Sequence, residues 1–365
     1  MDFNEKQGLL DEARRFGQLT RRGFVASAAT IAAGAGALAS GLVTSASAQE
    51  FDVPKTGKKV RVGLGLNYGP FNQPWRRGCW QLGKTVMDLG GELITVRGVP
   101  TKPSEQESAR TLLDRNIDVL VLGIYSLESE TAFIADEAKK RGIKTVGFAV
   151  PVKDSPFVSE DTYATGATLT YFAHNLCGRQ GTFVQTAESK GFYSPFDQEA
   201  DQFELMTKYE PRMKILPFMS GSVSTSDQIS KGRENMLSLM QANPQPGSIT
   251  GLVSWWWPLS IGAGQAMQQM GRTDIKIFNH YFSDQFLTDM AAGTYPIVFS
   301  TDVPWHIMGK KVGEMAMAIG RGVEIKPYMY RVPVTAITPD QAKAALAEVQ
   351  EMDTQAIAFL KPFGG

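Results

Sequence analysis

Cysteine and histidine are scarce in this chain of 365 residues, which contains two of the first and three of the second. The histidines have no paired spacing and CxxC is absent, so the sequence predicts no metal site. Cys79 and Cys177 are far apart, and a chain of this length can be stable on its core without a disulfide framework. We therefore expect two buried thiols. The HExxH and GxSxG patterns of zinc proteases and serine hydrolases are absent as well.

Net charge is also missing, because 37 Lys and Arg residues balance 37 Asp and Glu residues. A nucleic-acid-binding protein needs an excess of basic side chains to neutralise phosphates. Nucleic acid is therefore not an expected partner.

The N-terminal segment is the most informative part of what is present. Thr20-Arg21-Arg22-Gly23-Phe24 precedes an uncharged run rich in Ala, Gly and Ser that reaches Val43, and the small-residue triplet Ala46-Ser47-Ala48 follows. This order is typical of a twin-arginine export signal. We expect residues 1–48 to be removed, so that the mature protein starts near Gln49 in the periplasm. The same run could also be read as a membrane anchor, but few of its residues are strongly apolar.

From Lys58 onward, short β-rich apolar runs alternate with helical segments, which is typical of parallel strands joined by helices. The expected strands are 59–66, 93–97, 118–124, 144–149, 182–186, 214–218, 251–254, 275–278 and 296–300. The expected helices are 76–90, 104–116, 129–141, 162–177, 197–209, 226–242, 259–270, 284–292, 305–320 and a last one from Pro339. Ser104 and Glu107 have the spacing of a capping box at a helix start. The sequence predicts a doubly wound α/β fold.

The alternation begins a second time at Gly181, without a tandem sequence repeat. The residues beyond the signal are enough for one large or two medium domains with buried cores. Two domains of similar plan are expected.

The residues that follow four of the expected strands combine aromatic side chains with side chains that carry amide, carboxylate or basic groups. They are Asn67, Tyr68, Phe71, Asn72, Trp75 and Arg76 after the first strand, Trp255 and Trp256 after 251–254, His280 after 275–278 and Asp302 after 296–300; Asp197 and Asp227, at two helix starts, complete the candidate set. Ligands of open α/β sheets bind at the carboxyl ends of strands. Aromatic faces pack on the C–H faces of a sugar, and polar groups pair with its hydroxyls, because an unpaired buried polar group costs about 1 to 3 kcal/mol. The pattern indicates a site for a carbohydrate or polyol.

Three adjacent tryptophans cannot all face the same ligand. In an extended segment, Trp255 and Trp257 point to one side and Trp256 to the other. One or two of them are therefore expected in the core. For Trp75, ligand contact and simple packing both remain open.

Five segments resemble those of a known family in their order and spacing. They are Asn72-Gln73-Pro74-Trp75, Asn116-Ile117-Asp118-Val119-Leu120-Val121-Leu122, Glu160-Asp161-Thr162-Tyr163-Ala164-Thr165-Gly166, Gln241-Ala242-Asn243-Pro244 and Asp302-Val303-Pro304. Together they resemble type I periplasmic substrate-binding proteins of the ribose/galactose-binding cluster, which serve sugar ABC transporters. The resemblance covers roughly residues 58 to 335.

This resemblance implies two α/β lobes joined by three crossings, with one ligand enclosed between them by a hinge motion and no reaction catalysed. The lobes would be residues 58–178 with 303–328, and residues 179–302 with 329–365. It also implies that Asn72 and Trp75 contact the ligand and that Asp302 stands at a hinge position that bonds a hydroxyl. A monomer without a cofactor is the family's usual condition.

Three places depart from the family pattern. Trp256 stands where the family often has Asn or Asp, Asp197 lies near a usual Arg, and 148–151 replaces a strand end that commonly carries Asp-Arg. These departures favour a small polyhydroxy compound other than a standard aldopyranose. Arg76, at the start of a helix, could reach a ligand oxygen or pair with Asp302, which keeps sugar acids among the candidates.

The leading hypothesis is a solute-binding protein that captures a sugar, sugar alcohol or related small polyhydroxy compound and delivers it to an ABC permease. A sensory binding protein for chemotaxis or signalling would have the same cleft, and the sequence does not separate the two. The rival from another class is an exported enzyme. Its acid and base groups would come from Glu188, Asp197, Asp227 and His280.

Overall fold

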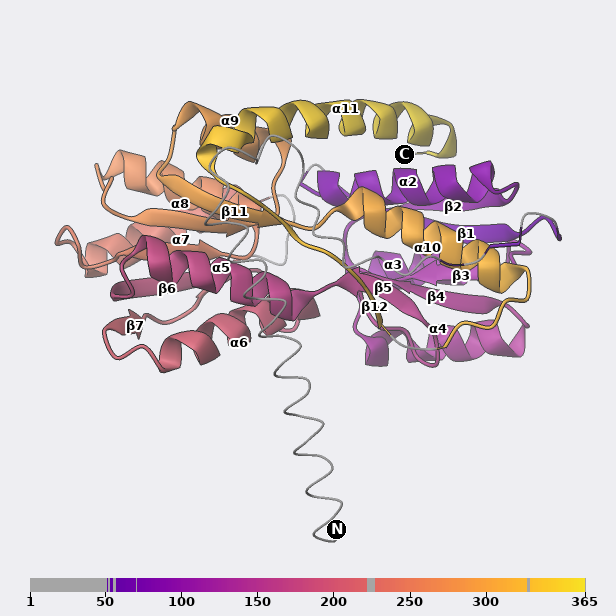
Figure 1. Ribbon diagram of the computed structural model, residues 1–365. Coiled ribbons are helices and arrows are strands. Elements are labelled where there is room, and N and C mark those ends of the chain that lie inside the picture. The colour runs from indigo at the N-terminus through magenta and orange to yellow at the C-terminus, as the bar shows by residue number, and fades with distance from the viewer. Residues whose placement is uncertain are drawn as a thin grey trace, which may run out of the picture. The chain divides into compact units, whose positions relative to one another are not determined.

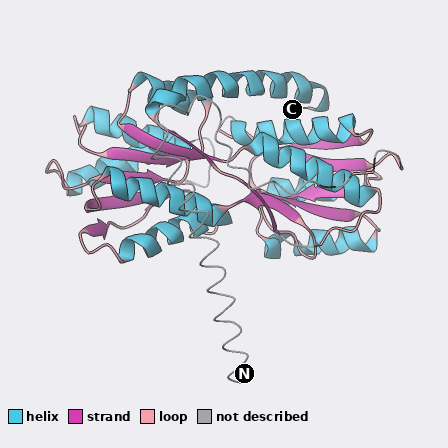
Figure 2. Ribbon diagram, in the orientation of Figure 1, coloured by secondary structure: helices cyan, strands magenta, loops and turns pink. Residues whose placement is uncertain are grey.

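The computed structural model describes residues 51, 53–54, 57–69, 71–221, 227–326 and 329–364 (Figure 1). The twin-arginine motif, the apolar run and the cleavage triplet lie outside these residues, so the export signal stays a prediction. The described residues form two β-sheets, each flanked by helices (Figure 2). None of the helices in this part of the chain is both long and apolar enough to cross a membrane.

The first sheet contains six strands in the order β12-β5-β4-β3-β1-β2, and all neighbours are parallel. The strands are β1 (Arg61–Asn67), β2 (Glu92–Gly98), β3 (Val119–Leu122), β4 (Lys144–Phe148), β5 (Phe157–Glu160) and β12 (Met329–Val332). Helices α2 (Gln73–Asp88), α3 (Lys102–Leu113), α4 (Glu128–Lys140) and α10 (Trp305–Gly320) pack on this sheet or on one another. Central strands such as β3, buried at every residue, are apolar throughout because both faces of the sheet are covered.

The second sheet has the order β13-β11-β10-β9-β6-β7, with β8 also beside β6. The strands are β6 (Gly181–Ala187), β7 (Met213–Ile215), β8 (Met219–Ser220), β9 (Gly251–Ser254), β10 (Lys276–His280), β11 (Ile297–Asp302) and β13 (Thr335–Ile337). Only β13 runs antiparallel to its neighbour in this described sheet. The helices are α5 (Thr162–Leu176), α6 (Ser194–Lys208), α7 (Gln228–Ala242), α8 (Trp257–Gln269) and α9 (Asp284–Ala292).

Both sheets follow the same plan. Counted along the chain within each sheet, the first five main strands have the spatial order 2-1-3-4-5, and one edge strand is added at the end. The direction of winding reverses between β1 and β3 in the first sheet and between β6 and β9 in the second. A crevice forms at such a reversal, and ligands of doubly wound sheets bind there. The predicted doubly wound α/β fold with two lobes is confirmed.

In the described residues the chain passes three times from one sheet to the other: after β5, after β11 and after β12. Two elements lie with a different sheet from the one that the expected lobe ranges gave them. Helix α5, placed by sequence in the first lobe, packs on α6 and β11 of the second, where Phe172 stacks on Phe299 at 4.0 Å between ring centres. Strand β12, placed in the second lobe, pairs with β5 because it extends the open edge of the first sheet.

The C-terminal helix α11 (Ala342–Leu360) contacts both lobes, whereas the sequence suggested packing on the second alone. It lies against α9 of the second lobe and α2 of the first (Figure 1). Asp353 of α11 pairs with Arg76 at 3.2 Å and with the buried Arg77 at 3.4 Å. These ion pairs tie α11 to the helix that follows β1.

Local signals account for the remaining differences from the predicted elements. Helix α3 starts before Ser104, because Thr101 is its N-cap and Pro103 fits the first turn, where its missing N–H is not needed. Strands β5, β8, β12 and β13 were not predicted. Each has four residues or fewer, which is too short for a visible alternation of apolar and polar residues.

The two cysteines are free thiols. Cys79 is completely buried, as expected, but Cys177 is only partly buried at the C-terminus of α5. Burial raises the pKa of both thiols, so neither is an activated nucleophile.

Candidate functional site

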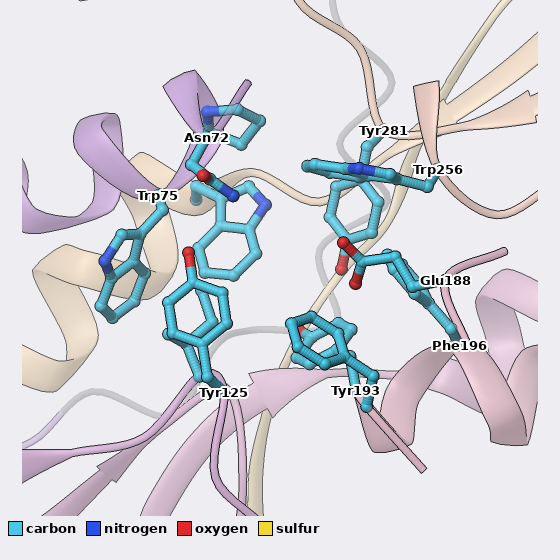
Figure 3. Close-up of a pocket in the computed structure, with 12 residues that line it drawn as sticks. Asn72, Trp75, Tyr125, Glu188, Tyr193, Phe196, Trp256 and Tyr281 are labelled. Atoms are coloured by element: carbon cyan, nitrogen blue, oxygen red, sulfur yellow. The ribbon is translucent and has the colours of Figure 1, made fainter. Parts of the chain in front are cut away.

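A cavity lies at the carboxyl ends of both sheets, with about 400 Å³ of space between its walls, part of it open to solvent. Its walls come from both lobes (Figure 3). The lining residues are Asn72, Pro74, Trp75, Ile124, Tyr125, Glu188, Phe192, Tyr193, Phe196, Trp256, Tyr281 and Trp305. Eight of these twelve side chains are aromatic, and Glu188 is the single acidic residue among them, with no Lys or Arg.

The strand order explains why these residues meet. Tyr125 follows β3, Glu188 follows β6 directly, and Trp256 follows β9. Asn72 and Trp75 stand at the start of α2, the helix that follows β1. These are the four strands at which the two sheets reverse their winding, so the cavity occupies both switch points.

The backbone is strained at two of the lining positions. Ile124 has a φ of 142° and Tyr281 a φ of 60°, values that side-chain-bearing residues rarely adopt. Gly123, before Ile124, has a φ of 113°, and a Cβ there would lie 2.7 Å from the carbonyl oxygen of Phe148. Such conformations persist only where the surrounding structure imposes them. Here they turn two strand ends toward the cavity.

The aromatic walls are held by contacts between their rings. Trp75 lies 4.4 Å from Phe148 and 5.7 Å from Trp305, measured between ring centres. On the opposite wall, Phe196 lies 5.9 Å from Trp256 and 5.6 Å from Tyr281. Tilted and edge-to-face pairs of this kind favour one relative orientation. Figure 3 shows Trp75 on one side of the cavity and Trp256 with Tyr281 on the other.

Few polar groups face the cavity. The Asn72 side chain accepts a hydrogen bond from the backbone N–H of Gly69 at 3.2 Å and leaves its amide N–H groups for a ligand. The Tyr125 hydroxyl and the indole N–H of Trp305 have no partner among the described residues. In Figure 3 the Asn72 amide, the Tyr125 hydroxyl and the Glu188 carboxylate all point inward. A bound molecule with matching polar atoms would remove the cost of leaving these groups unpaired.

Glu188 is the electrostatic centre of the cavity. Its side chain is nearly buried, and one oxygen accepts a hydrogen bond from the Gln228 amide at 3.0 Å. No Lys, Arg or His in the described part of the chain forms an ion pair with it. Burial raises the pKa of Glu188 to about 8. At neutral pH the empty cavity therefore holds a protonated carboxyl group that can both donate and accept.

A second group of buried carboxylates lies beside the cavity, where the chain first crosses between the sheets. Nε2 of His280 is 3.2 Å from Oε2 of Glu160 and 3.3 Å from Oε1 of Glu199, and Nδ1 is 2.9 Å from the Thr301 hydroxyl. All three of the side chains Glu160, Glu199 and His280 have 0% exposure. Burial alone would lower the pKa of His280, but the two carboxyl groups raise it well above its usual range. The imidazolium is thereby the internal counter-ion of this group.

Among the described residues, Glu160, Glu199 and His280 also form a group that could hold a metal ion. One nitrogen or oxygen atom from each lies within 4.8 Å of the other two. The sequence predicted no metal site, because its histidines have no paired spacing and CxxC is absent. An imidazolium between two carboxyl groups already supplies the positive charge that a metal ion would bring.

Two tyrosines connect the cavity to this buried group. Tyr193 donates from its hydroxyl to Oε1 of Glu160 at 3.3 Å, and Tyr281 donates to the same oxygen. Both rings line the cavity. The wall that faces a ligand is therefore bonded to the end of β5, where the chain leaves the first sheet.

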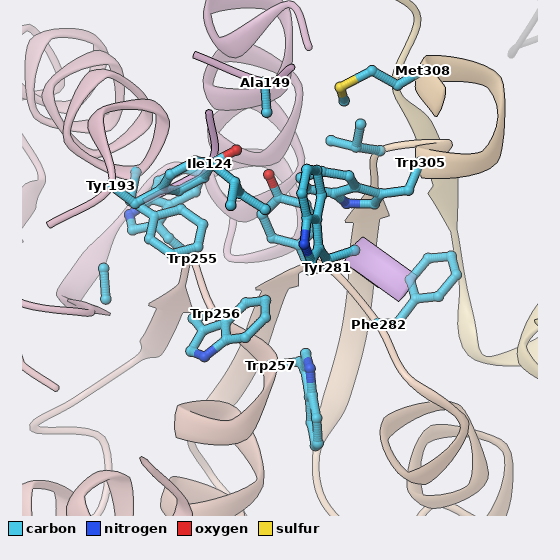
Figure 4. Close-up of a cluster of buried hydrophobic side chains, with 14 of the residues drawn as sticks. Ile124, Ala149, Tyr193, Trp255, Trp256, Trp257, Tyr281, Phe282, Trp305 and Met308 are labelled. Carbon is cyan, nitrogen blue, oxygen red and sulfur yellow. The ribbon is translucent and has the colours of Figure 1, made fainter. Parts of the chain in front are cut away.

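Three of the residues predicted from sequence line the cavity: Asn72, Trp75 and Trp256. Of the three tryptophans in a row, Trp255 is completely buried and its indole N–H donates to Gln185 at 2.9 Å. Trp257 is also buried, and its N–H donates to the backbone carbonyl of Phe71 at 3.2 Å across the lobes. Figure 4 shows the three indoles pointing in different directions. Trp255 is therefore a core residue, contrary to its place in the candidate set.

The other candidates after β1 have structural partners. Asn67 donates from its amide to Ser104, Ser108 and the backbone of Val99, which fixes β1 against α3. The Tyr68 ring lies under the Arg97 guanidinium at 4.4 Å.

Phe71 packs edge-on against Trp257 at 5.6 Å, outside the cavity lining. Arg76 pairs with Asp353 of α11 rather than with Asp302 or a ligand. The sequence could not show this partner, because the two residues are 277 positions apart.

The remaining acidic candidates and His280 also lie outside the lining. Asp302 accepts from the backbone N–H of Phe282 at 3.3 Å at the second crossing, and burial raises its pKa to about 7. Asp197 accepts from the N–H of Gly191 at 2.8 Å, and Asp227 is exposed before α7. His280 belongs to the buried group beside the cavity.

Sequence reasoning missed most of the second wall. Tyr125 and Glu188 follow expected strands, so the strand-end rule could have found them as ligand contacts; Glu188 was considered only as an acid or base. Tyr281 follows β10 in the same way. Phe192, Tyr193, Phe196 and Trp305 lie at or before helix starts, where an aromatic residue gives no signal of its own.

A nucleotide-binding pattern is also present and has a structural explanation. Residues 78–85 match GxxxxGKT, which in a strand–loop–helix context binds phosphates. Here they lie inside α2, where Thr85 donates to the carbonyl of Gln81 and Lys84 pairs with Asp88. A helix interior offers no loop of free N–H groups, so this match has no phosphate site.

Solved structures share this fold over nearly their whole length. An ABC transporter solute-binding protein from Agrobacterium vitis with bound allitol is 20% identical, with a TM-score of 0.70, covering 80% of this chain and 100% of that chain. A 5-methylthioribose transporter solute-binding protein from Thermotoga lettingae, in complex with 5-methylthioribose, is 18% identical, with a TM-score of 0.71, covering 84% and 94%. One from Mycobacterium smegmatis with bound glycerol is 20% identical, with a TM-score of 0.67, covering 79% and 97%. At these identities the likeness shows the fold.

A comparison with curated proteins gave no match. The family described as periplasmic binding protein domain matches residues 66–324, which is most of the chain and includes all of the cavity lining. Together with the two similarly wound sheets and the three crossings, this match identifies the chain as a member of the periplasmic binding protein domain family.

Proposed function

We propose that this protein captures a sugar, a sugar alcohol or a related small polyhydroxy compound between its lobes and delivers it to an ABC permease. The single observation that carries the proposal is the cavity at both switch points, lined from both sheets. Such a cavity opens when the lobes separate about the crossings, so capture and release need only a hinge motion.

The similar structures support the class of solute. Those from A. vitis, T. lettingae and M. smegmatis were solved with allitol, 5-methylthioribose and glycerol, all small hydroxylated molecules. The family is one of periplasmic proteins, in agreement with the export signal predicted at the N-terminus. We therefore place the protein in the periplasm.

We propose binding without catalysis. Of the four residues that an enzyme could have used as acid or base, Glu188 lines the cavity, while Asp197, Asp227 and His280 do not. Acid–base catalysis generally needs a group within hydrogen-bond reach of the reacting atoms. The described lining supplies one carboxyl group and no second carboxyl, His or Lys beside it.

A thermal-shift panel of sugars, sugar alcohols and related polyols tests this proposal. A ligand at about 100 times its Kd adds about 2.7 kcal/mol to the free energy of unfolding, which raises the Tm by several degrees. Trp75→Ala should abolish the ligand-induced shift. Trp80→Ala is the matched control, because Trp80 lies on the same helix and is nearly as buried but does not line the cavity.

Both variants should lower the Tm of the empty protein, since each leaves a void in the core. Only Trp80→Ala should keep the shift with ligand. The proposal is overturned if no compound of the panel raises the Tm, or if Trp75→Ala responds like the unmodified protein.

A further inference from the structure

The cavity combines aromatic faces with a single carboxyl group. Eight aromatic side chains from both lobes surround it, and no Lys, Arg or His stands among its described lining residues. The face of an aromatic ring carries partial negative charge, so it attracts cations and gives nothing to an anion. The aromatic faces of the lining therefore favour a cation over an anion.

Glu188 has no positively charged partner among the described residues. Its one hydrogen-bond partner, the Gln228 amide, is uncharged. Basic side chains around the site have other partners or are neutral. Arg76 and Arg77 pair with Asp353, His280 pairs with Glu160 and Glu199, and Lys190 lies 4.0 Å from Asp201. Burial lowers the pKa of His306 to about 4. A buried carboxylate is stable only when it is protonated or paired with a positive charge.

We infer that the solute carries one cationic nitrogen, as an amino sugar or amino alcohol does, and that this nitrogen binds at Glu188 between the aromatic walls. The inference rests on the proposed function, and it narrows the class of hydroxylated solute to those that bear an amine or a quaternary ammonium group.

The geometry fits such a molecule at both ends. In Figure 3 the Glu188 carboxylate projects between Trp256 and Tyr193, so a nitrogen that pairs with it also lies against ring faces. The Tyr125 hydroxyl and the Asn72 amide point into the cavity and would bond the hydroxyls of the solute. A neutral hexitol, by contrast, presents six hydroxyls to a lining with few polar atoms, and each unpaired one lowers the affinity.

The number of protons released on binding distinguishes a cationic solute from a neutral one, because only a cation displaces the proton on Glu188. Because burial holds its pKa at about 8, Glu188 is mostly protonated in the empty protein at pH 7. A cation bound beside it lowers that pKa, so about one proton leaves for each cation bound. Tyr125, whose pKa burial and the Glu188 charge both raise, stays protonated throughout and does not contribute.

Two pairs of compounds that differ mainly in charge test the inference by titration calorimetry at pH 7. The first is 1-amino-1-deoxy-D-glucitol with D-glucitol, and the second is choline with 3,3-dimethyl-1-butanol. The charged member of at least one pair should bind roughly tenfold or more tightly than its neutral partner. Runs in two buffers of different ionisation enthalpy should give a release of about one proton.

Glu188→Gln, which keeps the side-chain shape, should lose the preference for the charged member and the proton release. Glu234→Gln removes a carboxylate from an exposed position on α7 and should leave both unchanged. If Glu188→Gln does not fold, the proton count of the unmodified protein decides on its own.

The outcomes separate this inference from the proposed function. The inference is overturned if neutral compounds bind as tightly as charged ones. It is also overturned if neutral compounds bind without proton release and the cations do not bind. In both cases the proposal of solute capture stands. If none of the four compounds and no member of the polyol panel binds, both are overturned.

Discussion

The buried carboxyl groups at the crossing and in the cavity are compensated in opposite ways. Glu160 and Glu199 share the imidazolium of His280, and two tyrosine hydroxyls also donate to Glu160. Glu188 has one amide partner and no described cation. The first arrangement contains its own cation, although burial raises the pKa of Glu199 to about 8 and its oxygens have no hydrogen-bond partner among the described residues. The second is incomplete until something enters the cavity, which is why we assign it to the ligand.

The largest expected effect comes from removing the internal counter-ion. His280→Ala should lower the free energy of unfolding by about 3 to 5 kcal/mol at pH 7, because it leaves two buried carboxyl groups without a cation. Urea unfolding followed by circular dichroism measures this loss.

His174→Ala is the matched control. His174 is also buried, but its Nε2 meets only the neutral hydroxyl of Thr207, at 2.9 Å. Its loss should be clearly smaller. Equal losses for the two variants would mean that charge compensation at the crossing contributes little.

A smaller effect is expected from neutralising the uncompensated carboxyl. The folded-state pKa of Glu188, about 8, lies above the ordinary value of 4.5, so the folded state binds more protons. The protonated Glu188 does not lower the free energy of unfolding below about pH 4.5. As the pH rises from there to about 8, the free energy of unfolding falls, because the unfolded state releases this proton first. Glu188→Gln removes this loss and should be more stable than the unmodified protein at pH 8 by about 2 to 4 kcal/mol.

At pH 5 the two proteins should be nearly equal. Other buried acids with raised pKa values, such as Glu105, also make the folded protein less stable as the pH rises over this range. The quantity to measure is therefore the difference in free energy of unfolding between Glu188→Gln and the unmodified protein at each pH. A difference that stays constant from pH 5 to pH 8 would contradict the assigned protonation state.

The smallest effect compares two tyrosines of the cavity wall. Tyr281→Phe should cost about 2 kcal/mol, since it removes a hydroxyl that donates to the Glu160 carboxyl. Tyr125→Phe should be neutral or slightly stabilising in the empty protein, because the Tyr125 hydroxyl has no described partner. Thermal unfolding without ligand separates them, and the reverse order would argue that Glu160 does not depend on its donors.

The fold was largely readable from the sequence. The expected strand 59–66 and helix 162–177 correspond to β1 and α5 within two residues at each end, because long apolar runs and clear caps mark them. Strand β12 was missed and its segment was given to the other lobe, since a short edge strand is fixed by its neighbour β5 rather than by its own pattern.

The cavity was readable only in part. Trp75 and Trp256 could be chosen because they follow strands, but nothing local distinguishes Trp256 from Trp255 beyond the alternation of an extended segment. Arg76 and His280 looked equally suited to a ligand. Their actual partners, Asp353 and Glu160, come from elements more than a hundred residues away, and such pairings depend on the tertiary fold.

Three of the six tryptophans in the chain, Trp75, Trp256 and Trp305, stand in the cavity wall. Indole fluorescence responds to the polarity of its surroundings and to nearby charges, so loading of the cavity should change the emission of half of the tryptophans at once. The protein thus contains its own optical reporter, and unlabelled material is enough to follow the rate at which a solute enters and leaves.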